Sequence, residues 1–481
     1  MSDSPLRVAI IGGGVAGLSA AFTLRRLSAD AQVDLFESSG RVGGAVQTEF
    51  IDGFLVERGA DMFATEPNAG LELCSELGLE DELITPLPTA RGAAIVQGGK
   101  LIRIPDGFVL MRPTLLWPMM RTPLLSMRGK LRLLMEPFVK RRSDVSDESI
   151  ESFVSRRLGR ETLDRIVQPL VGGIYTGDVA KLSMAATMSQ FWEMERRDGS
   201  LYRATLRRNR EGTDTTEQNS AGARYEKFRS FPLGMNRLMS ELGNRIDSQR
   251  LHLSHSVVRI SREHNAWQVT DATGLSHGPF DHVIVATPAA KAATLLAPLA
   301  PDASQELRQI PFASSAVVVF GLHEKTIQQK LSVAGFIVPL REQRRILAVS
   351  FTGDKFEGRT PPQHKLLRVF IGGEMQADLL QHSDEELIKI AKEELRELIG
   401  LSGEPVLTKV VRWQEAMPQY HVGHIQKLAK IQASLEQLPG LSLIGNSLHG
   451  VGIAPTIAYA RKVARSIVES HAIGRRVKAS E

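Results

Sequence analysis

Residues 7–27 read RVAIIGGGVAGLSAAFTLRRL, and this stretch decides the fold. The apolar run Val8–Ile11 predicts a buried parallel strand, and Ala16–Leu27 predicts a helix. A G-x-G-x-x-G turn joins them, formed by Gly12, Gly14 and Gly17. In such a turn the first glycine allows the tight bend, the second lets the backbone approach a pyrophosphate, and the third lets the helix pack on the strand. We therefore expect a dinucleotide at the helix N-terminus; the alternative is a tight turn without a ligand.

The next segment, residues 33–44 (VDLFESSGRVGG), narrows the kind of dinucleotide. Glu37 ends the second predicted strand, 20 residues after Gly17, where a carboxylate can bind ribose hydroxyls. Arg41 and two glycines follow as E-x-x-x-R-x-G-G, a continuation that is unusual in NAD dehydrogenases. It resembles the FAD-binding signature of the flavin amine oxidase superfamily, and a glycine-rich surface turn is the alternative interpretation. The resemblance implies FAD as the cofactor.

A second FAD element is expected near the C-terminus, because this fold closes over the isoalloxazine ring late in the chain. Residues 441–469 read LSLIGNSLHGVGIAPTIAYARKVARSIVE. They predict a strand at Leu441–Ile444, a glycine-rich turn and then a helix. The positive end of that helix would face the flavin N1/C2 carbonyl and stabilise negative charge on the reduced ring.

The resemblance assigns cofactor contacts at both ends of the chain and in the middle, where the backbone of Val257 would meet the adenine. The expected FAD-binding residues are Gly12, Gly13, Gly14, Val15, Ala16, Gly17, Glu37, Ser38, Arg41, Gly44, Ala45, Gly59, Ala60, Asp61, Met62, Val257, Trp413, Gly445, Val451, Gly452 and Ile453. Cys74, the only cysteine, is far in sequence from the C-terminal motif, so we expect the flavin to be bound non-covalently. A single cysteine also excludes an intramolecular disulfide and suits a reducing compartment.

Charge and hydropathy limit the partners. The net charge is +5, and residues 91–142 hold eleven Lys/Arg against two acids. Such a segment attracts an anionic ligand or an anionic membrane, although a solvated basic face is the alternative. No nucleic-acid motif accompanies it. Phe108–Met127 is the most apolar stretch, but Arg112, Arg121 and three prolines interrupt it, so we expect no membrane span. It predicts a peripheral membrane patch, a pocket mouth or plain core.

The chain, at 481 residues, is long enough for two or three domains, and its elements predict an α/β protein with an interleaved arrangement. A Rossmann-like FAD-binding domain would comprise residues 1–90, 228–290 and 405–481, with strands at Leu251–Val258 and Trp267–Thr270 in its middle part. Residues 91–227 would be mainly helical, with a flexible polar loop at Arg196–Gly222. Residues 291–404 would form an α+β substrate domain. Its predicted elements are strands at Ala316–Leu322, Phe336–Pro339, Ile346–Phe351 and Leu366–Ile371 and a helix at Asp384–Ile399.

Several further segments carry a narrower resemblance. They are ESFVSRRLGRETLDRIVQPLVGGIYTGDVAKLSM (151–184), FRSFPLGMNRLMSEL (228–242), RVFIGGE (368–374), RWQEAMPQYHVGH (412–424) and GNSLHGVGIAP (445–455). Together they resemble the oxygen-dependent porphyrinogen oxidases of haem biosynthesis, which act on protoporphyrinogen IX or coproporphyrinogen III. Amine oxidases and phytoene desaturases share the FAD ends but not the first of these segments or the PQY-x-x-GH element.

The family chemistry implies a catalytic centre without a protein nucleophile. Flavin can take hydride from an sp³ meso carbon while a pyrrole N–H is lost. Repeating this step three times removes six electrons and gives the porphyrin, and molecular oxygen is reduced to hydrogen peroxide. The protein would hold and orient the macrocycle.

The resemblance also assigns substrate contacts. Arg91 occupies the position of a propionate-binding arginine, Phe370 matches an aromatic that packs on the macrocycle, and Ile337 matches an apolar residue on its opposite side. Asp61 replaces an asparagine close to substrate and flavin. Ser350 replaces an apolar pocket residue of plant-type enzymes, and this polar exchange favours coproporphyrinogen slightly. Solvent exposure of Arg91, a structural role for Asp61 and core burial of the two apolar residues are the alternatives.

The remaining interpretations concern metals, other functions and location. His421 and His424 resemble a metal pair, but the sequence offers no third ligand, so no metal is expected. Alternative functions are a superfamily oxidase acting on an amine or carotenoid, and a non-catalytic FAD-fold escort protein. The first predicted strand begins too early to leave room for a signal peptide, which favours the cytoplasm or peripheral contact at the inner face of the membrane. A homodimer is a further expectation, and the sequence leaves the choice between the two porphyrinogens open.

Overall fold

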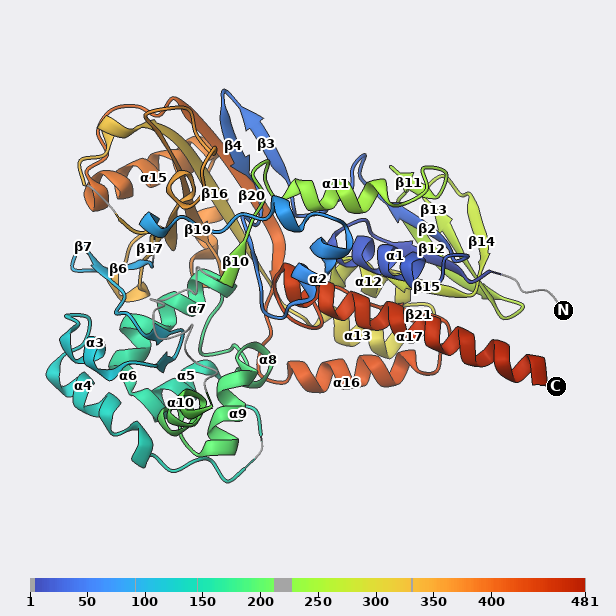
Figure 1. Cartoon of the computed structure of the whole chain (residues 1–481), viewed down its shortest axis with the longest axis horizontal. Helices are drawn as coiled ribbons and strands as arrows, with labels where there is room; N and C mark the ends of the chain where they lie inside the picture. The colour runs from blue at the N-terminus through green and yellow to red at the C-terminus, as the bar shows by residue number, and fades with distance from the viewer. Residues whose placement is uncertain (1–4, 91, 145, 212–226, 330–331, 481) are drawn as a thin grey trace.

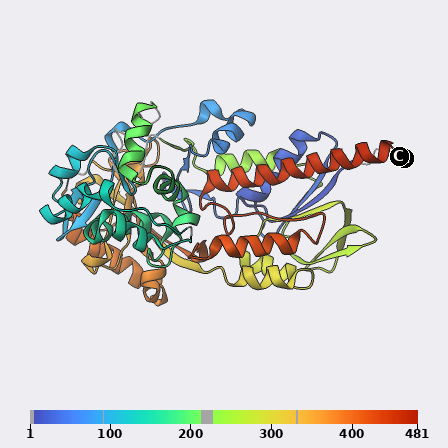
Figure 2. The ribbon, with the colours of Figure 1, turned by 90° about the horizontal axis from the view of Figure 1, so that it is seen from below.

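The computed structural model describes residues 5–90, 92–144, 146–211, 227–329 and 332–480. Figure 1 shows a two-lobed molecule. One lobe holds a parallel sheet and long helices. The other holds a large, mainly antiparallel sheet above a group of short helices. Figure 2 shows how the long helices α16 (His424–Leu435) and α17 (Ile453–Ser480) extend along the first lobe. The architecture is mixed α/β, as predicted.

The parallel sheet forms the centre of the first lobe. Its strands, in spatial order, are β11 (Leu251–Leu253), β2 (Gln32–Glu37), β1 (Arg7–Ile11), β15 (His282–Val285) and β21 (Leu441–Leu443). Alternate side chains of β1 face opposite sides of the sheet. Val8 and Ile10 belong to one core, whereas Ala9 and Ile11 belong to another. Because both faces are buried, β1 reads as a continuous apolar run.

Helices cover both faces of this sheet. One face packs against α1 (Val15–Leu27), α2 (Ala69–Glu76), α11 (Asn236–Asn244) and α17. The other packs against α12 (Ala289–Leu296), α13 (Pro301–Arg308), α16 and a small sheet of β12 (Val257–Glu263), β13 (Ala266–Asp271) and β14 (Ser276–Phe280). The strand–turn–helix unit expected at residues 8–27 is confirmed, with the helix starting one residue earlier than predicted.

The single strand that the pattern predicts at residues 251–258 is wrong in one respect, because the structure divides it. β11 pairs in parallel with β2, whereas β12 pairs antiparallel with β13. Ser254, between them, has a φ of 60°, a left-handed conformation that interrupts the strand. Apolar periodicity cannot reveal that one run serves two sheets.

The large sheet has seven strands. In spatial order they are β20 (Leu407–Pro418), β16 (Phe312–His323), β19 (His364–Gly372), β18 (Ala348–Phe351), β17 (Gly335–Ile337), β6 (Ala94–Gln97) and β7 (Lys100–Arg103). β17 and β6 pair in parallel and the other neighbours pair antiparallel. Helix α15 (Asp384–Ile399) packs on one face. The sheet therefore combines strands from all three segments that the sequence separates into domains.

The short helices pack around a further core, to which Ile95 of β6 also contributes. They are α3 (Leu116–Arg121), α4 (Met127–Leu134), α5 (Ile150–Leu158), α6 (Arg160–Thr162), α7 (Gln168–Tyr175), α8 (Met184–Thr187), α9 (Ser189–Asp198) and α10 (Leu201–Arg210). Paired short strands complete the fold: β3 (Thr48–Ile51) with β4 (Phe54–Glu57), β5 (Phe63–Ala64) with β10 (Phe228–Arg229), and β8 (Phe108–Val109) with β9 (Arg112–Pro113). None of the helices described is long and apolar enough to cross a membrane.

The polar loop expected at Arg196–Gly222 is wrong over its first half. The end of α9 and all of α10 occupy it, while residues 212–226 lie outside the described residues. The Ser200 side chain caps α10 by accepting a hydrogen bond from the Arg203 N–H (3.1 Å). Leu201, Ala204 and Thr205 are buried. One narrow buried face is enough to hold a helix whose other positions are polar.

Candidate active site

The glycine turn after β1 leaves an open space in front of helix α1. A Cβ atom on Gly12 would lie 2.7 Å from the Ala286 carbonyl oxygen, and one on Gly17 would lie 1.9 Å from the Gly12 oxygen, so both positions require glycine. A Cβ on Gly14 would meet no heavy atom of the described residues within 4 Å. Gly14 is also the N-cap of α1, and no described side chain caps this helix. The helix thus presents free N–H groups to a space that suits a phosphate.

Glu37 is held beside this turn. Its Oε2 accepts a hydrogen bond from the Gly13 N–H (2.7 Å), and its Oε1 accepts from the N–H and hydroxyl of Ser39 (both 2.8 Å). Ser38 contacts the same Oε1 at 3.3 Å. Each carboxylate oxygen has about two acceptor positions, and Oε2 has the Gly13 N–H as its one partner among the described residues, so Oε2 retains a position for a ribose hydroxyl.

Arg41 shapes the loop that follows. Its guanidinium donates to the carbonyl oxygens of Val42 (3.1 Å) and Gly44 (2.8 Å) and to Gln47 Oε1 (2.9 Å). The Gly43 N–H donates to the Gly13 carbonyl oxygen (2.8 Å). The loop is thereby fixed against the glycine turn after β1, where Gly14 and Gly43 form a parallel bridge.

The C-terminal glycine loop is anchored by the PQY-x-x-GH element. Tyr420 Oη donates to the Asn446 carbonyl oxygen, and His424 Nε2 lies 3.1 Å from the Leu448 carbonyl oxygen. The two rings stack, with centroids 4.0 Å apart and planes at 12°. Burial lowers the pKa of His424 to about 4, so the ring is neutral and its Nε2–H donates. This element therefore positions residues 445–452.

The two histidines of this element do not form the metal pair that their spacing suggests. His424 is committed to the loop, and His421 Nε2 lies 3.4 Å from Glu374 Oε1. His424 therefore has a hydrogen-bond partner, whereas His421 Nε2 has a carboxylate nearby but no hydrogen bond within the described residues.

The large sheet brings three predicted substrate residues to one face. Phe370 pairs with Ala348, which pairs with Ile337; two positions along, Arg368 pairs with Ser350. Directly paired residues and residues two apart in a strand project to the same side. Ile337, Ser350 and Phe370 therefore share a face, with Arg368 beside them.

Other elements enclose this face. A Cβ on Gly173, in α7, would lie 3.4 Å from Ile337 Cγ2. Ile337 and Val451, from the C-terminal glycine loop, both pack against the core of the short helices. Ser350 Oγ and Arg368 Nε are buried without a hydrogen-bond partner among the described residues. The face thus combines an apolar platform with unpaired polar atoms, as a ligand with both kinds of group requires.

Asp61 lies in a buried cluster of charges. Its Oδ2 accepts a hydrogen bond from Lys355 Nζ (3.0 Å) and lies 3.8 Å from Arg368 Nη1. Burial favours the neutral acid, but the charges of Lys355 and Arg368 outweigh it and lower the pKa of Asp61 to about 2. Arg368 also donates to the Gly59 carbonyl oxygen. The cluster ties the segment 59–62 to the face that carries Ser350 and Phe370.

Sequence reasoning did not find Lys355 or Arg368. A signal was present at Arg368, because a cation inside the apolar strand KLLRVFIG requires a buried partner. Nothing local marks Lys355, which is 294 positions from Asp61 in the chain.

The other predicted positions are distributed around these elements. Val15 and Ala16 start α1, Ala45 and Ala60 lie in the two loops beside Gly44 and Gly59, Val257 starts β12, and Ile453 starts α17. A Cβ on Gly59 would lie 2.1 Å from the Ala45 oxygen and 3.7 Å from Trp413 Cζ2, so these segments are in close contact. Ser230 Oγ donates to the Asp61 carbonyl oxygen, next to Met62. Arg91 lies outside the described residues.

Comparison with known proteins agrees with this arrangement. Residues 15–468 match the family described as flavin containing amine oxidoreductase. The chain belongs to this family. It is therefore a flavin-containing oxidoreductase, and the superfamily expected from the FAD signature is confirmed.

Individual relatives span nearly the whole chain. The coproporphyrinogen III oxidase of Bacillus subtilis is 31% identical, over 95% of this chain and 97% of the relative. The enzyme of the same name from Propionibacterium freudenreichii is 32% identical, over 97% and 92%. Protoporphyrinogen oxidase 2 of Arabidopsis thaliana is 28% identical, over 96% and 94%.

Solved structures show the same fold. A protein from Exiguobacterium, assigned as a protoporphyrinogen oxidase, has a TM-score of 0.81 and 28% identity, covering 97% of this chain and 99% of that one. A putrescine oxidase, at 16% identity and a TM-score of 0.68, shares the fold alone.

Proposed function

We propose that this protein is an FAD- and oxygen-dependent oxidase of haem biosynthesis that converts a porphyrinogen, with coproporphyrinogen III preferred, into the porphyrin. The observation that supports the proposal is the sheet face shared by Ile337, Ser350 and Phe370, which lies beside the same core as Val451 of the C-terminal glycine loop. Relatives named coproporphyrinogen III oxidase, at 30–32% identity over nearly the whole chain, support the substrate class.

The residues present fit FAD bound without a covalent link. Free N–H groups of α1 and the open space at Gly14 suit the pyrophosphate, and Glu37 suits the ribose. Gly445 and Gly452 have positive φ values, and a Cβ atom on either would meet its nearest heavy atom only at 3.9 Å, so the backbone before α17 has room for a ligand. Cys74 is fully buried in the core, where burial raises its thiol pKa to about 12. It is therefore unsuited to bonding the flavin.

The chemistry needs a hydride acceptor, which bound FAD would supply. FAD takes two electrons at a time, so each of the three steps would be followed by reoxidation with one molecule of oxygen, which gives one hydrogen peroxide. The protein's own part is to hold the ring. Phe370 and Ile337 share a sheet face with Ala348 between them, so they would pack on opposite sides of a macrocycle that stands edge-on to the sheet. Arg91 would pair with a propionate. Ser350 Oγ and Arg368 Nε would hydrogen-bond polar groups of the substrate. Asp61, kept ionised by its two cations, would accept from pyrrole N–H groups.

The same proposal includes contact with an anionic membrane from the cytoplasmic side. Trp117, Met127, Leu131 and Phe138 are 57–81% exposed, on α3, α4 and the turn that follows. Exposed cations occur in the same segment, namely Arg121, Arg128, Lys140 and Arg141, and the Arg121 guanidinium lies over the Trp117 ring. Large exposed apolar side chains beside arginines favour the boundary between lipid headgroups and acyl chains. A homodimer stays a prediction from the family resemblance.

Substrate choice is the direct test. Purified, flavin-loaded protein in air is mixed with coproporphyrinogen III or protoporphyrinogen IX, and porphyrin fluorescence is followed with hydrogen peroxide. The proposal predicts faster turnover of coproporphyrinogen III, with about three peroxides per porphyrin from six electrons removed. Faster turnover of protoporphyrinogen IX would reverse the substrate preference, and no turnover of either would refute the function.

A further inference from the structure

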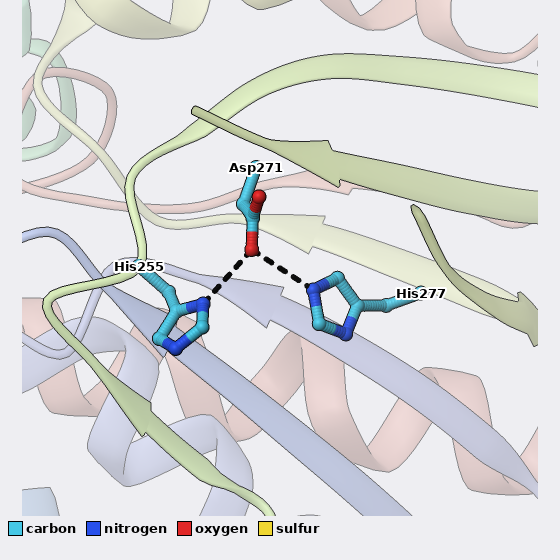
Figure 3. Close-up of side chains that lie close together, drawn as sticks. All are labelled: His255, Asp271 and His277. Carbon is cyan, nitrogen blue, oxygen red and sulfur yellow. Dashed lines mark hydrogen bonds and ion pairs between the residues drawn. The ribbon is translucent and has the colours of Figure 1, made fainter. Parts of the chain in front are cut away.

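Three side chains lie close together at the small sheet of β12, β13 and β14, which packs on one face of the parallel sheet (Figure 3). His255 precedes β12, Asp271 ends β13 and His277 lies in β14. Asp271 Oδ2 lies 2.9 Å from His255 Nδ1 and 3.1 Å from His277 Nε2. All three atoms lie within 4.8 Å of one another. The sequence alone does not indicate this group, because its members lie at three different strands and their spacing matches no metal-binding motif.

Asp271 is oriented in advance by its other oxygen. Oδ1 accepts hydrogen bonds from the Thr273 N–H (2.9 Å), the Thr273 hydroxyl (2.5 Å) and the Leu275 N–H (3.2 Å). The side chain is only 1% exposed. Oδ2 is therefore the oxygen left to face the two imidazoles. Such fixing of a ligand by outer hydrogen bonds is common in metal sites.

An aromatic ring supports the His277 imidazole, and both imidazoles are partly exposed to solvent. His277 packs edge-on to Phe36, with centroids 4.9 Å apart. His252 stacks on the Phe36 ring, with centroids 4.5 Å apart, and its Nε2 lies 2.9 Å from Asp34 Oδ1. Because its Nε2 is paired with Asp34, we do not count His252 as a fourth ligand. The side chains of His255 and His277 are 35% and 16% exposed. An ion could reach them, and water could complete the coordination.

The distances suit a small transition-metal ion. With bonds of about 2.0–2.1 Å, tetrahedral ligand atoms lie roughly 3.3 Å apart. The two oxygen–nitrogen distances already match, so only the two ring nitrogens must move closer. On binding, His255 Nδ1 and His277 Nε2 would offer lone pairs in place of the N–H bonds that they now direct at Asp271.

We propose that His255, Asp271 and His277 bind one divalent transition-metal ion, with zinc as the reference ion and water in the remaining position. Two imidazoles and a carboxylate are a donor set that zinc accepts and that magnesium and calcium disfavour. The backbone N–H of His255 donates to the Glu37 carbonyl oxygen (2.9 Å), so the site would join the small sheet to the end of β2. The role is structural.

The test is zinc titration of the full-length holoprotein, followed by calorimetry. We expect one zinc ion per chain in the wild type and at least tenfold weaker binding in His255→Gln and in His277→Gln. His364→Gln is the control, because His364 pairs with another imidazole, His323, at 5.3 Å. It should bind zinc as the wild type does.

A second readout separates loss of the site from loss of the fold. Cobalt(II) in place of zinc should give the visible absorption of a four-coordinate ion in the wild type and in His364→Gln. It should give none in His255→Gln, whose side chain is 35% exposed and lies outside the hydrophobic cores. Flavin content should be equal in all four proteins. Absence of stoichiometric zinc in the wild type, or unchanged binding in both site variants, would overturn the proposal.

Discussion

The assignment of the pyrophosphate to the glycine turn depends on Gly14 having no Cβ atom. A side chain at this position would project into open space and not into protein. Gly14→Val should therefore fold but purify without flavin, because the side chain occupies the volume of the phosphates. Flavin absorbance of the purified protein measures this. Gly40→Ala, in the neighbouring exposed loop, should retain its flavin, and normal flavin content in Gly14→Val would contradict the assignment.

The ionised state of Asp61 depends on Lys355. With its pKa near 2, Asp61 stays charged throughout the neutral range, so it should give no acid limb in the pH profile of kcat/KM between about pH 5 and 8. Lys355→Met removes one cation and leaves the burial, which raises the pKa. Protonation then increases as pH falls, and activity should be lost on the acid side. The profiles of the two proteins check this; identical profiles would exclude Asp61 from substrate contact.

Arg91 can be tested although the structure does not describe it. If it pairs with a propionate, the contact exists in the bound substrate as much as in the transition state. Arg91→Ala should raise KM about tenfold and change kcat much less. Steady-state kinetics with coproporphyrinogen III gives both constants. An unchanged KM would remove Arg91 from the site.

At the scale of elements, the PQY-x-x-GH segment before and at the start of α16 holds the C-terminal glycine loop through two hydrogen bonds. Tyr420→Phe removes one of them, which costs about 1 kcal/mol and should weaken FAD binding about fivefold. Fluorescence titration of the apoprotein with FAD measures this. Tyr202→Phe, in α10, should bind FAD normally. Equal affinities in the two variants would show that the anchor does not position the cofactor.

The sequence predicts the bounds of a helix correctly where capping residues mark both of its ends. Helix α15 starts and ends where expected, because Ser383 and Glu386 form a capping box and Gly400 ends the helix with a φ of 67°. The helix α10 was mistaken for a loop, because its composition is polar and its buried face is narrow. The run at residues 251–258 was read as one strand, because periodicity does not reveal a change of sheet.

Contacts between distant segments were out of reach of the sequence alone. The family resemblance assigned a role to Asp61, but its partner Lys355 lies 294 positions away in the chain. The His255–Asp271–His277 group likewise forms only when β12, β13 and β14 pair. The shared face of Ile337, Ser350 and Phe370 likewise follows from the register of three strands. A sequence pattern can indicate residue types, whereas register and pairing decide which of them meet.

At the scale of the whole molecule, the exposed apolar patch on α3 and α4 should govern membrane contact. The double variant Trp117→Ser/Phe138→Ser should sediment much less with phosphatidylglycerol vesicles than the wild type, and binding should weaken as salt rises. Phe50→Ser, which removes an exposed apolar side chain on β3, is the control. Equal sedimentation of all three proteins would contradict a specific membrane face.

The central claim is that this flavin-containing oxidoreductase takes electrons from a porphyrinogen. The most direct measurement is the flavin absorbance near its visible maximum when coproporphyrinogen III is added without oxygen. We predict rapid bleaching by the first two electrons, followed on admitting air by return of the flavin colour, completion of the porphyrin and release of hydrogen peroxide. A flavin that keeps its colour with both coproporphyrinogen III and protoporphyrinogen IX would contradict the account.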